Sequence, residues 1–207
     1  MAKIKWKGGA LIAPVPPAMI SCGNTADGTA NIITIAWTGI VNTIPPKTYI
    51  SVRPSRHSYN LIKESGEFAI NLTTADLVKK ADYCGIYTGA KVNKFEKCDL
   101  HPEQASEISC PIIEESPLSL ECRVTDVIPM GTHHMFLADI VAVDVDETLL
   151  DKDGKLRLDK ARLAAFAHGE YFALGEKLGT FGFSVKKKKK KAPQKKGAAP
   201  HKEVDKK

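Results

Sequence analysis

The sequence predicts a mainly β protein, in which a closed β-barrel forms the core and short helices are appended to it. Short runs of β-branched and aromatic residues recur along the first 185 residues and outnumber the helical patterns. The helical stretches are short and do not alternate regularly with the strands, as they would in a doubly wound sheet. A chain of 207 residues is long enough for one domain with a sizeable core. We therefore expect a single barrel domain over residues 1–185.

The first strand patterns lie in residues 19–22 and 30–39, with a turn over residues 23–28 between them. The second run is the strongest strand signal in the chain, and it contains two polar positions, Asn31 and Thr34. A buried polar group needs a hydrogen-bonding partner. Bonding between strands and contact with a polar ligand ring both explain these positions, and the residues themselves leave the choice open.

The next elements are a strand, a polar turn, a short helix and another strand. Residues 49–53 alternate as a half-buried strand, which Pro54 cannot continue. Ser58 stands where a helix N-cap belongs, and Gly66 supplies the end of that helix. Residues 68–71 then form a short strand.

The polar turn concentrates two arginines, a histidine and two serines at a predicted helix start: Arg53, Ser55, Arg56, His57 and Ser58. A helix start presents N–H groups and a partial positive charge, and arginine adds forked donors that match phosphate. The pattern predicts a phosphate site, although a solvated turn with surface arginines explains it equally well. The sequence has no Gly-x-Gly-x-x-Gly or Walker-type loop, so the usual nucleotide cradle is not expected.

The second half of the chain is predicted to contain further strands and two helical segments. The expected elements are a helix over residues 75–81, a loop over 87–95 from which Lys94 projects, strands over 111–113, 118–124 and 133–147, a hairpin turn over 151–155, and a partly helical segment over 163–178 interrupted near Gly169.

The net charge of +6 is unevenly distributed along the chain. Residues 186–207 hold 11 of the 30 lysines and arginines but only two of the 24 acidic residues, so this segment carries +9 and the rest carries −3. A mildly acidic body does not indicate a nucleic-acid surface across the fold. The lysine-rich tail has no apolar face and is expected to be disordered, with weak non-specific binding to polyanions as an alternative to a purely solubilising role.

The cysteines and the apolar runs indicate a cytoplasmic protein. Five cysteines, an odd number without a Cys-x-x-Cys motif, are expected to be reduced thiols. Prolines 14, 16 and 17 break the apolar run after the first lysines, which argues against a signal peptide. No apolar stretch approaches the ~18 residues that a membrane-spanning helix needs.

Four sequence blocks resemble the flavin reductase-like family, and the flavoredoxin type within it. They are residues 31–39, 51–58, 67–71 and 94–95, in the family's order, and the resemblance runs from about residue 10 to about residue 183. It implies a split β-barrel of Greek-key-like topology that forms a homodimer and binds FMN. It also implies a protein that reduces flavin with NADH or NADPH, or relays electrons through bound FMN to a redox partner protein.

The resemblance also implies a set of FMN-binding residues. They are Asn31, Thr34, Ala36, Trp37 and Thr38 along the isoalloxazine ring, Ser51, Arg53 and Ser58 at the phosphate with Asn71 close by, Lys94 at the ring or the phosphate, and His133 and Phe166 closing the pocket. Thr88-Gly89 departs from the Ser-Gly of many relatives, which puts the contacts of that loop in doubt.

The reactive atoms belong to the flavin, so the expected oxidoreductase needs no catalytic acid–base pair or nucleophile and no metal. Lys94 and His133 are the expected cations near the ring. For His133 or His134 alone, a strand-edge position without a role is a slightly better explanation. A metal site built from this pair and a cysteine is a weaker alternative, because consecutive strand residues face opposite sides. Two other functions remain open: a non-catalytic flavin-binding or electron-carrier module, and a basic-tailed adaptor whose barrel is only structural.

Overall fold

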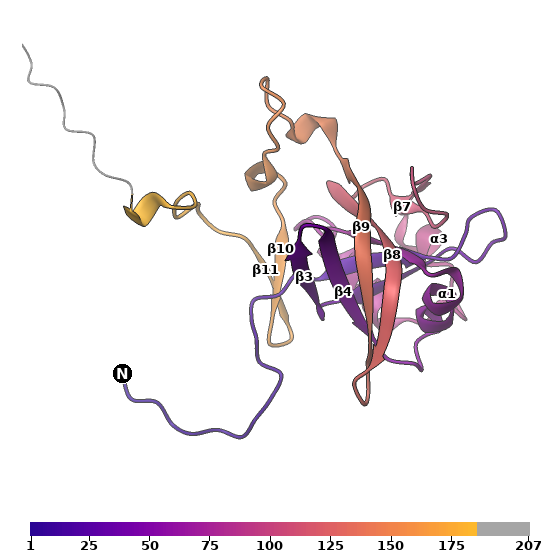
Figure 1. Ribbon diagram of the computed structural model, residues 1–207, viewed down its shortest axis with the longest axis horizontal. Coiled ribbons are helices and arrows are strands. Elements are labelled where there is room, and N and C mark those ends of the chain that lie inside the picture. Colours follow the sequence, from indigo (N-terminus) through magenta and orange to yellow (C-terminus); the bar gives the residue numbers. More distant parts are fainter. Residues whose placement is uncertain (186–207) are drawn as a thin grey trace, which may run out of the picture. The chain divides into compact units, whose positions relative to one another are not determined.

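The structure, a computed structural model, describes residues 1–185 (Figure 1). The chain divides into two compact units, Met1–Gly175 and a second that begins at Glu176. In the described part of the second unit, the 3₁₀ helix η3 spans Phe183–Val185. The predicted lysine-rich tail, residues 186–207, lies outside the described residues, so its disorder and the domain boundary before it stay predictions.

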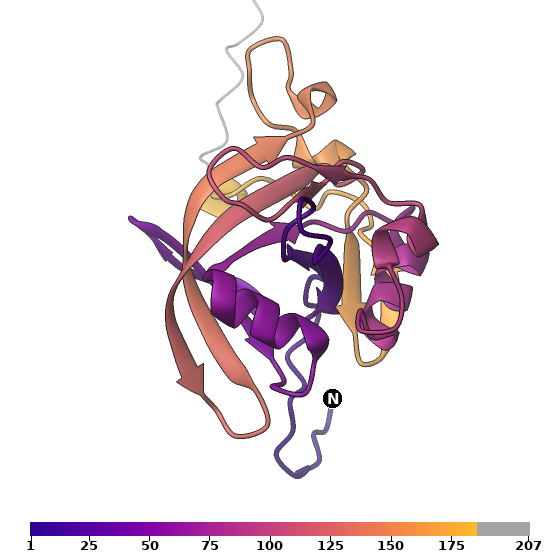
Figure 2. The ribbon, with the colours of Figure 1, turned by 90° about the vertical axis from the view of Figure 1, so that its right-hand side faces the viewer.

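The mainly β prediction is confirmed, because one curled antiparallel sheet dominates the first unit (Figure 2). Within residues 1–185 this sheet has seven strands in the order β2-β1-β5-β8-β9-β4-β3. The strands are β1 (Ala18–Cys22), β2 (Asn31–Ile35), β3 (Thr38–Thr43), β4 (Pro46–Val52), β5 (Glu67–Asn71), β8 (Leu118–Pro129) and β9 (His134–Val145). The long strands β8 and β9 lie side by side as a hairpin (Figure 1).

Small elements surround the sheet. Two strand pairs are separate from it, β6 (Pro102–Glu103) with β7 (Ile112–Ile113) and β10 (Ala164–Ala167) with β11 (Glu170–Ala173). The helices are α1 (His57–Ser65), α2 (Val78–Ile86), α3 (Lys94–Cys98) and the short 3₁₀ turns η1 (Glu147–Leu149) and η2 (Leu158–Lys160). The helix expected over 75–81 starts later than predicted, because α2 begins after its N-cap Leu77.

The strand predicted over residues 30–39 is in fact two strands at opposite edges of the sheet. β2 ends at Ile35 and pairs with β1, whereas β3 begins at Thr38 and pairs with β4. Ala36 and Trp37 connect them, and the Ser51 backbone N–H of β4 donates to the Trp37 carbonyl at 2.9 Å. This connection links the two edge strands of the curled sheet. The extended run over residues 30–39 is therefore interrupted at Ala36 and Trp37.

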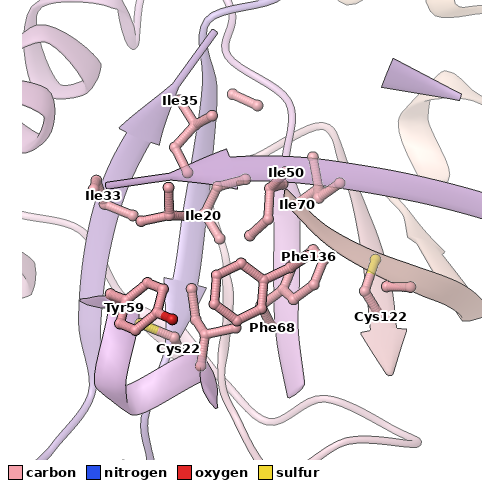
Figure 3. Close-up of a cluster of buried hydrophobic side chains, with 14 residues drawn as sticks. Ile20, Cys22, Ile33, Ile35, Ile50, Tyr59, Phe68, Ile70, Cys122 and Phe136 are labelled. Atoms are coloured by element: carbon pink, nitrogen blue, oxygen red, sulfur yellow. The ribbon is translucent and has the colours of Figure 1, made fainter. Parts of the chain in front are cut away.

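The concave side of the sheet is filled by its own side chains. Phe68, Phe136 and Ile50 are fully buried there, and Tyr59 of α1 packs edge-on against Phe136 with ring centroids 5.3 Å apart (Figure 3). The alternation of strand side chains places Met19 on the other face of β1, in a second cluster beneath α2 and α3. Both faces of β1 are therefore covered, and the interior of the barrel has no room for a three-ring cofactor.

The predicted partly helical segment over 163–178 is wrong, because β10 and β11 form a hairpin there. His168 and Gly169 connect the strands, and both have positive φ values, 50° and 91°. Two such residues make the tight turn whose twist suits a hairpin. Phe166 of β10 also exchanges backbone hydrogen bonds with Val15, which fixes the hairpin against the N-terminal segment.

All five cysteines are free and buried. The Sγ atoms of Cys84 and Cys98 lie 3.9 Å apart without a disulfide bond. Across residues 1–185, none of the helices has both the length and the apolar character to cross a bilayer.

Candidate functional site

A large pocket of about 460 Å³ lies at the corner where β2 turns into β3. Its lining comes from the end of β2 and the connection after it, the end of β4, the turn before α1, the start of β9 and the β10 strand: Ile33, Thr34, Ile35, Ala36, Trp37, Ser51, Val52, Arg53, Ser55, Arg56, His133 and Phe166. The volume is typical of a small-molecule site. Trp37, 41% exposed, and Phe166 supply aromatic surfaces, which suit a flat ring system.

Arg53 and His133 form the polar end of the large pocket. The Arg53 Nε–H donates to His133 Nε2 at 3.4 Å, and His133 Nδ1 lies 2.9 Å from the Thr132 hydroxyl. Burial, and then the positive charge of Arg53, lower the pKa of His133 below its ordinary value. The imidazole is therefore neutral near pH 7, and Arg53 rather than His133 brings positive charge to this end. His134 faces elsewhere, with Nδ1 2.7 Å from the Tyr59 hydroxyl.

A small polar pocket of about 70 Å³ adjoins the large one. The two pockets share Ile33, Ser55 and Arg56, and the remaining lining of the small pocket is His57, Ser58, Tyr87, Thr88, Gly89 and Lys94. His57 and Ser58 are the first residues of α1, where the helix presents N–H groups and a positive dipole. Anion-binding features therefore gather in the small pocket.

The predicted N-cap role of Ser58 is wrong. The N-cap of α1 is Arg56, without a side-chain cap, and Ser58 lies inside the helix. The buried Ser58 hydroxyl instead accepts a hydrogen bond from Asn31 Nδ2 at 2.8 Å. This bond ties the start of β2 to the start of α1. Gly66 does end the helix as predicted, in the left-handed conformation with φ 69°.

Lys94 is buried at the base of the small pocket and does not project from a loop as predicted. It is the first residue of α3, which Asn93 caps, and it is 3% exposed. Its Nζ donates to the carbonyls of Ile32 at 2.6 Å and Cys84 at 2.8 Å. An ammonium group has three donors, so one is left for a ligand. Burial lowers the pKa of Lys94 to about 8, because desolvation penalises the charged form.

Two features hold the walls of the small pocket in place. The Arg56 Nη2 donates to the carbonyl of Gly85, at the C-terminal end of α2. Gly89 packs so closely that an added Cβ would lie 2.1 Å from Asn31 Oδ1 and 2.9 Å from His57 Cδ2. The loop backbone and the start of α1 therefore lie so close together at the small pocket that a side chain at position 89 would clash with them.

The structure brings most of the predicted site residues to these two pockets. Thr34, Ala36, Trp37, Ser51, Arg53, His133 and Phe166 line the large pocket, and Ser58 and Lys94 line the small one. Asn31 lies behind the small pocket, bonded to Ser58. Thr38 lies in β3 with its hydroxyl bonded to the Tyr49 carbonyl at 2.6 Å, and it lines neither pocket.

The expected place of Asn71 beside the phosphate is wrong. Its Nδ2 donates to the Met19 carbonyl at 3.0 Å and to the Ser21 hydroxyl at 2.9 Å. Its Oδ1 accepts from the Ile113 N–H at 2.9 Å and the Ser119 hydroxyl at 2.7 Å. A fully buried amide that is satisfied by four protein groups links four strands and has little capacity left for a ligand.

Several lining residues were missed by sequence reasoning. Arg56 and His57 belong to the polar turn that predicted an anion site, so the composition of that turn was a usable signal. Tyr87 and Gly89 gave no such signal, because their position depends on how α2 packs against β2. Residues 1–185 contain no group of three or more His, Cys, Asp or Glu side chains that could hold a metal ion.

Comparisons with known proteins agree with the fold described above. A family model described as "Flavin reductase like domain" matches residues 12–175. The structure of the flavoredoxin of Desulfovibrio vulgaris (Miyazaki F) is 30% identical in sequence, covers 89% of this chain and 100% of its own, and superimposes with a TM-score of 0.83. For the flavoredoxin of Methanosarcina acetivorans the values are 29%, 90%, 100% and 0.79. An uncharacterised protein of Archaeoglobus fulgidus is 34% identical over 125 residues, 60% of this chain and 70% of that protein.

Proposed function

The chain belongs to the flavin reductase-like family, and on this premise we propose that it binds FMN and acts as an FMN-dependent oxidoreductase. The observation that carries the proposal is the continuity of the two pockets. One is large with aromatic surfaces, the other is small and cationic, and they share three lining residues. FMN has the matching pair of parts, a flat ring system and a terminal phosphate joined by a flexible ribityl chain.

The phosphate belongs in the small polar pocket. Its volume of about 70 Å³ suits one phosphate group and excludes a ring system. Lys94, Arg56 and the start of α1 supply positive charge and donors there. This assignment differs from the expectation that Ser51 and Arg53 hold the phosphate together with Ser58, because both of those residues line the large pocket.

The isoalloxazine ring belongs in the large pocket, where Trp37 and Phe166 offer apolar contact. The bound ring would supply the electron-transfer chemistry, so the protein needs no nucleophile of its own. Arg53 holds a fixed positive charge in this pocket, and the hydrogen bond it donates orients the neutral His133 ring. The Thr34 hydroxyl is already bonded to the Ala81 carbonyl at 2.5 Å, so it lines the pocket mainly as a packing group.

The proposed activity is reduction of flavin by NADH or NADPH, or relay of electrons through FMN to a partner protein. We place it in the cytoplasm, which is the reducing compartment that suits five free cysteines. The test is the absorbance of the FMN-loaded protein under anaerobic conditions, with NADH and NADPH added in separate samples. Loss of the oxidised-flavin absorbance with either nucleotide, at a rate above that of free FMN, supports the reductase activity.

Two controls make the result decisive. The Lys94→Met variant, mixed with the same concentrations of FMN and nucleotide, should bleach only at the rate of free FMN. Bound FMN that neither nucleotide bleaches, while a chemical reductant does, would favour the electron-carrier module. A protein that does not retain FMN at all would contradict the proposed function and leave the barrel as a structural adaptor.

A further inference from the structure

The hairpin of β10 and β11 carries Phe166 to the large pocket, although it lies outside the seven-stranded sheet. Backbone hydrogen bonds tie its first strand to the rest of the unit. The Ala164 N–H donates to the Thr73 carbonyl, and Phe166 exchanges two bonds with Val15. These bonds fix the backbone at Phe166, but the rotamer of its ring is set by the side chains that pack against it.

The Phe166 side chain borders open space on more than one side. Besides the large pocket it lines an apolar pocket of about 210 Å³, and Trp37 also lines both. The N-terminal segment and the turn of the β10–β11 hairpin supply the other walls of this apolar pocket. A side chain between two cavities lacks the close packing that locks rotamers in a protein core. The ring therefore needs a neighbour that holds it in one orientation.

Tyr171 of β11 is placed to be that neighbour. It is directly opposite Phe166 in the register of the hairpin, so the two side chains share a face. Their rings meet edge to face, with centroids 5.1 Å apart and an interplanar angle of 62°. The Tyr171 hydroxyl donates to Asp82 Oδ1 of α2 at 3.1 Å. Burial, this hydrogen bond and the charge of the carboxylate raise the pKa of Tyr171 to about 12, so the hydroxyl keeps its proton near neutral pH.

Building on the proposed function, we infer that Tyr171 is a positioning residue that holds the Phe166 ring in the orientation in which it contacts the isoalloxazine ring. A group that is already in its binding orientation loses less conformational entropy when the ligand arrives. Tyr171 lines neither the large nor the small pocket, so it acts through Phe166. Its contribution belongs to the ring system and is therefore the same for FMN and riboflavin, unlike that of Lys94.

The test is a double-mutant cycle at positions 166 and 171, with calorimetric titration of the full-length, flavin-stripped protein by FMN and by riboflavin. Tyr171→Leu should weaken both flavins about threefold to tenfold, the size expected for loss of one aromatic pair. Tyr171→Phe keeps the ring and should weaken them less. In the Phe166→Ala background Tyr171→Leu should have no further effect, because no ring is left to position.

Two further variants complete the design. Phe172→Leu is the matched control, because Phe172 is exposed and the alternation of strand residues places it on the other face of β11. It should leave both Kd values unchanged. Asp82→Ala removes the anchor of Tyr171 from outside the hairpin. It should weaken both flavins in the same direction and lose its effect in the Phe166→Ala background, which keeps the inference testable if Tyr171→Leu does not fold.

The visible circular dichroism of the bound flavin is a second measurement, because it reports how the groups around the isoalloxazine ring are arranged. The dichroism should change in Tyr171→Leu and stay that of the wild type in Phe172→Leu. Urea unfolding of each variant shows that the protein being titrated is folded.

The outcomes separate this inference from the proposed function. A loss of affinity in Tyr171→Leu that persists in full in the Phe166→Ala background would assign Tyr171 a general structural role, and the FMN site would stand. A loss for FMN without one for riboflavin would place the effect at the phosphate and also overturn the inference. So would wild-type affinity and dichroism in Tyr171→Leu. If the wild type binds neither flavin, both proposals fail.

Discussion

At the scale of single residues, Lys94 shows how burial changes what a lysine can do. Its ammonium group is almost completely buried and two of its donors are bonded to backbone carbonyls, while desolvation lowers its pKa to about 8. A bound phosphate would favour the charged form and raise this pKa. In the proposed FMN complex Lys94 is a phosphate ligand, and in the flavin-free protein its charge is lost at mildly alkaline pH.

The first prediction is a pH dependence of FMN affinity. A group whose pKa is higher in the complex than in the free protein strengthens binding fully below the free pKa, and that contribution declines as pH rises above it. FMN affinity should therefore fall as the pH rises above about 8, while riboflavin, which lacks the phosphate, should show no such fall. Fluorescence titrations on both sides of this pH measure the effect. Parallel losses for the two flavins would show that Lys94 does not act on the phosphate.

The second prediction concerns removal of that charge. Lys94→Met should weaken FMN binding by about 2–3 kcal/mol, typical of a hydrogen bond to a charged group, and spare riboflavin. It should also lower the free energy of unfolding by about 1–3 kcal/mol, because the Ile32 and Cys84 carbonyls lose their donor. Calorimetry and urea unfolding measure the two effects. Lys97→Met is the control, because Lys97 is exposed in the same helix. This variant removes one positive charge without removing a buried hydrogen-bond donor.

Arg53 provides the contrasting variant. It lines the large pocket, so Arg53→Ala should weaken FMN and riboflavin to the same extent. Selective loss of FMN in this variant would instead place the phosphate beside Arg53, as the sequence alone had led us to expect.

At the scale of elements, the sequence predicted those whose signals are local. The strand before Pro54, the helix that Gly66 ends and the long strand after residue 133 all follow from alternation or from Pro and Gly positions. The break at Ala36 and Trp37 was missed, because it depends on pairing with strands far away in sequence. The β10–β11 hairpin was missed because Gly169 was interpreted as an interruption of a helix, although it completes a hairpin turn.

The same distinction holds for the candidate site. The polar turn before α1 predicted an anion site from its composition, and the resemblance to a family named many of the residues that line the large pocket. The burial of Lys94 could not be predicted, because it depends on carbonyls from β2 and α2 that only the folded chain brings near. Asn71 was misplaced for the same reason, since its partners come from three other strands.

The third prediction tests the loop that closes the small pocket. Gly89→Ala should weaken FMN binding strongly, because the new Cβ would overlap Asn31 Oδ1 and push the loop away from α1. Riboflavin should lose less affinity. Gly175→Ala, where an added Cβ meets nothing within 4 Å, is the control. Equal FMN affinity of the Gly89→Ala variant and the wild type would mean that the phosphate lies elsewhere.

At the scale of the whole molecule, the filled interior of the barrel leaves only its outer wall for the proposed FMN. Phe68 and Phe136 occupy the concave side, and Trp37 in the large pocket remains partly exposed. The edge strand β3 also exposes Val41, beside further apolar residues. An exposed apolar edge strand invites pairing with another chain. We propose that a second copy of the protein covers this surface and shields the flavin ring from water.

The fourth prediction links this dimer to the cofactor. A two-fold interface is self-complementary, so two equivalent FMN sites should form per dimer. FMN should then tighten subunit association by mass action. Analytical ultracentrifugation over a dilution series, with and without FMN, measures the effect, and Val41→Glu should shift the protein towards monomer. A protein that stays monomeric at high concentration while fully loaded with FMN would rule out a shared site.

The central claim is that FMN lies across the two pockets, with its phosphate in the small one. A crystal structure of the FMN complex tests it most directly. The account predicts the phosphate between Lys94 and the start of α1, and the ring against Trp37 and Phe166. A phosphate bound beside Arg53 and His133, with the small pocket left to solvent, would contradict it.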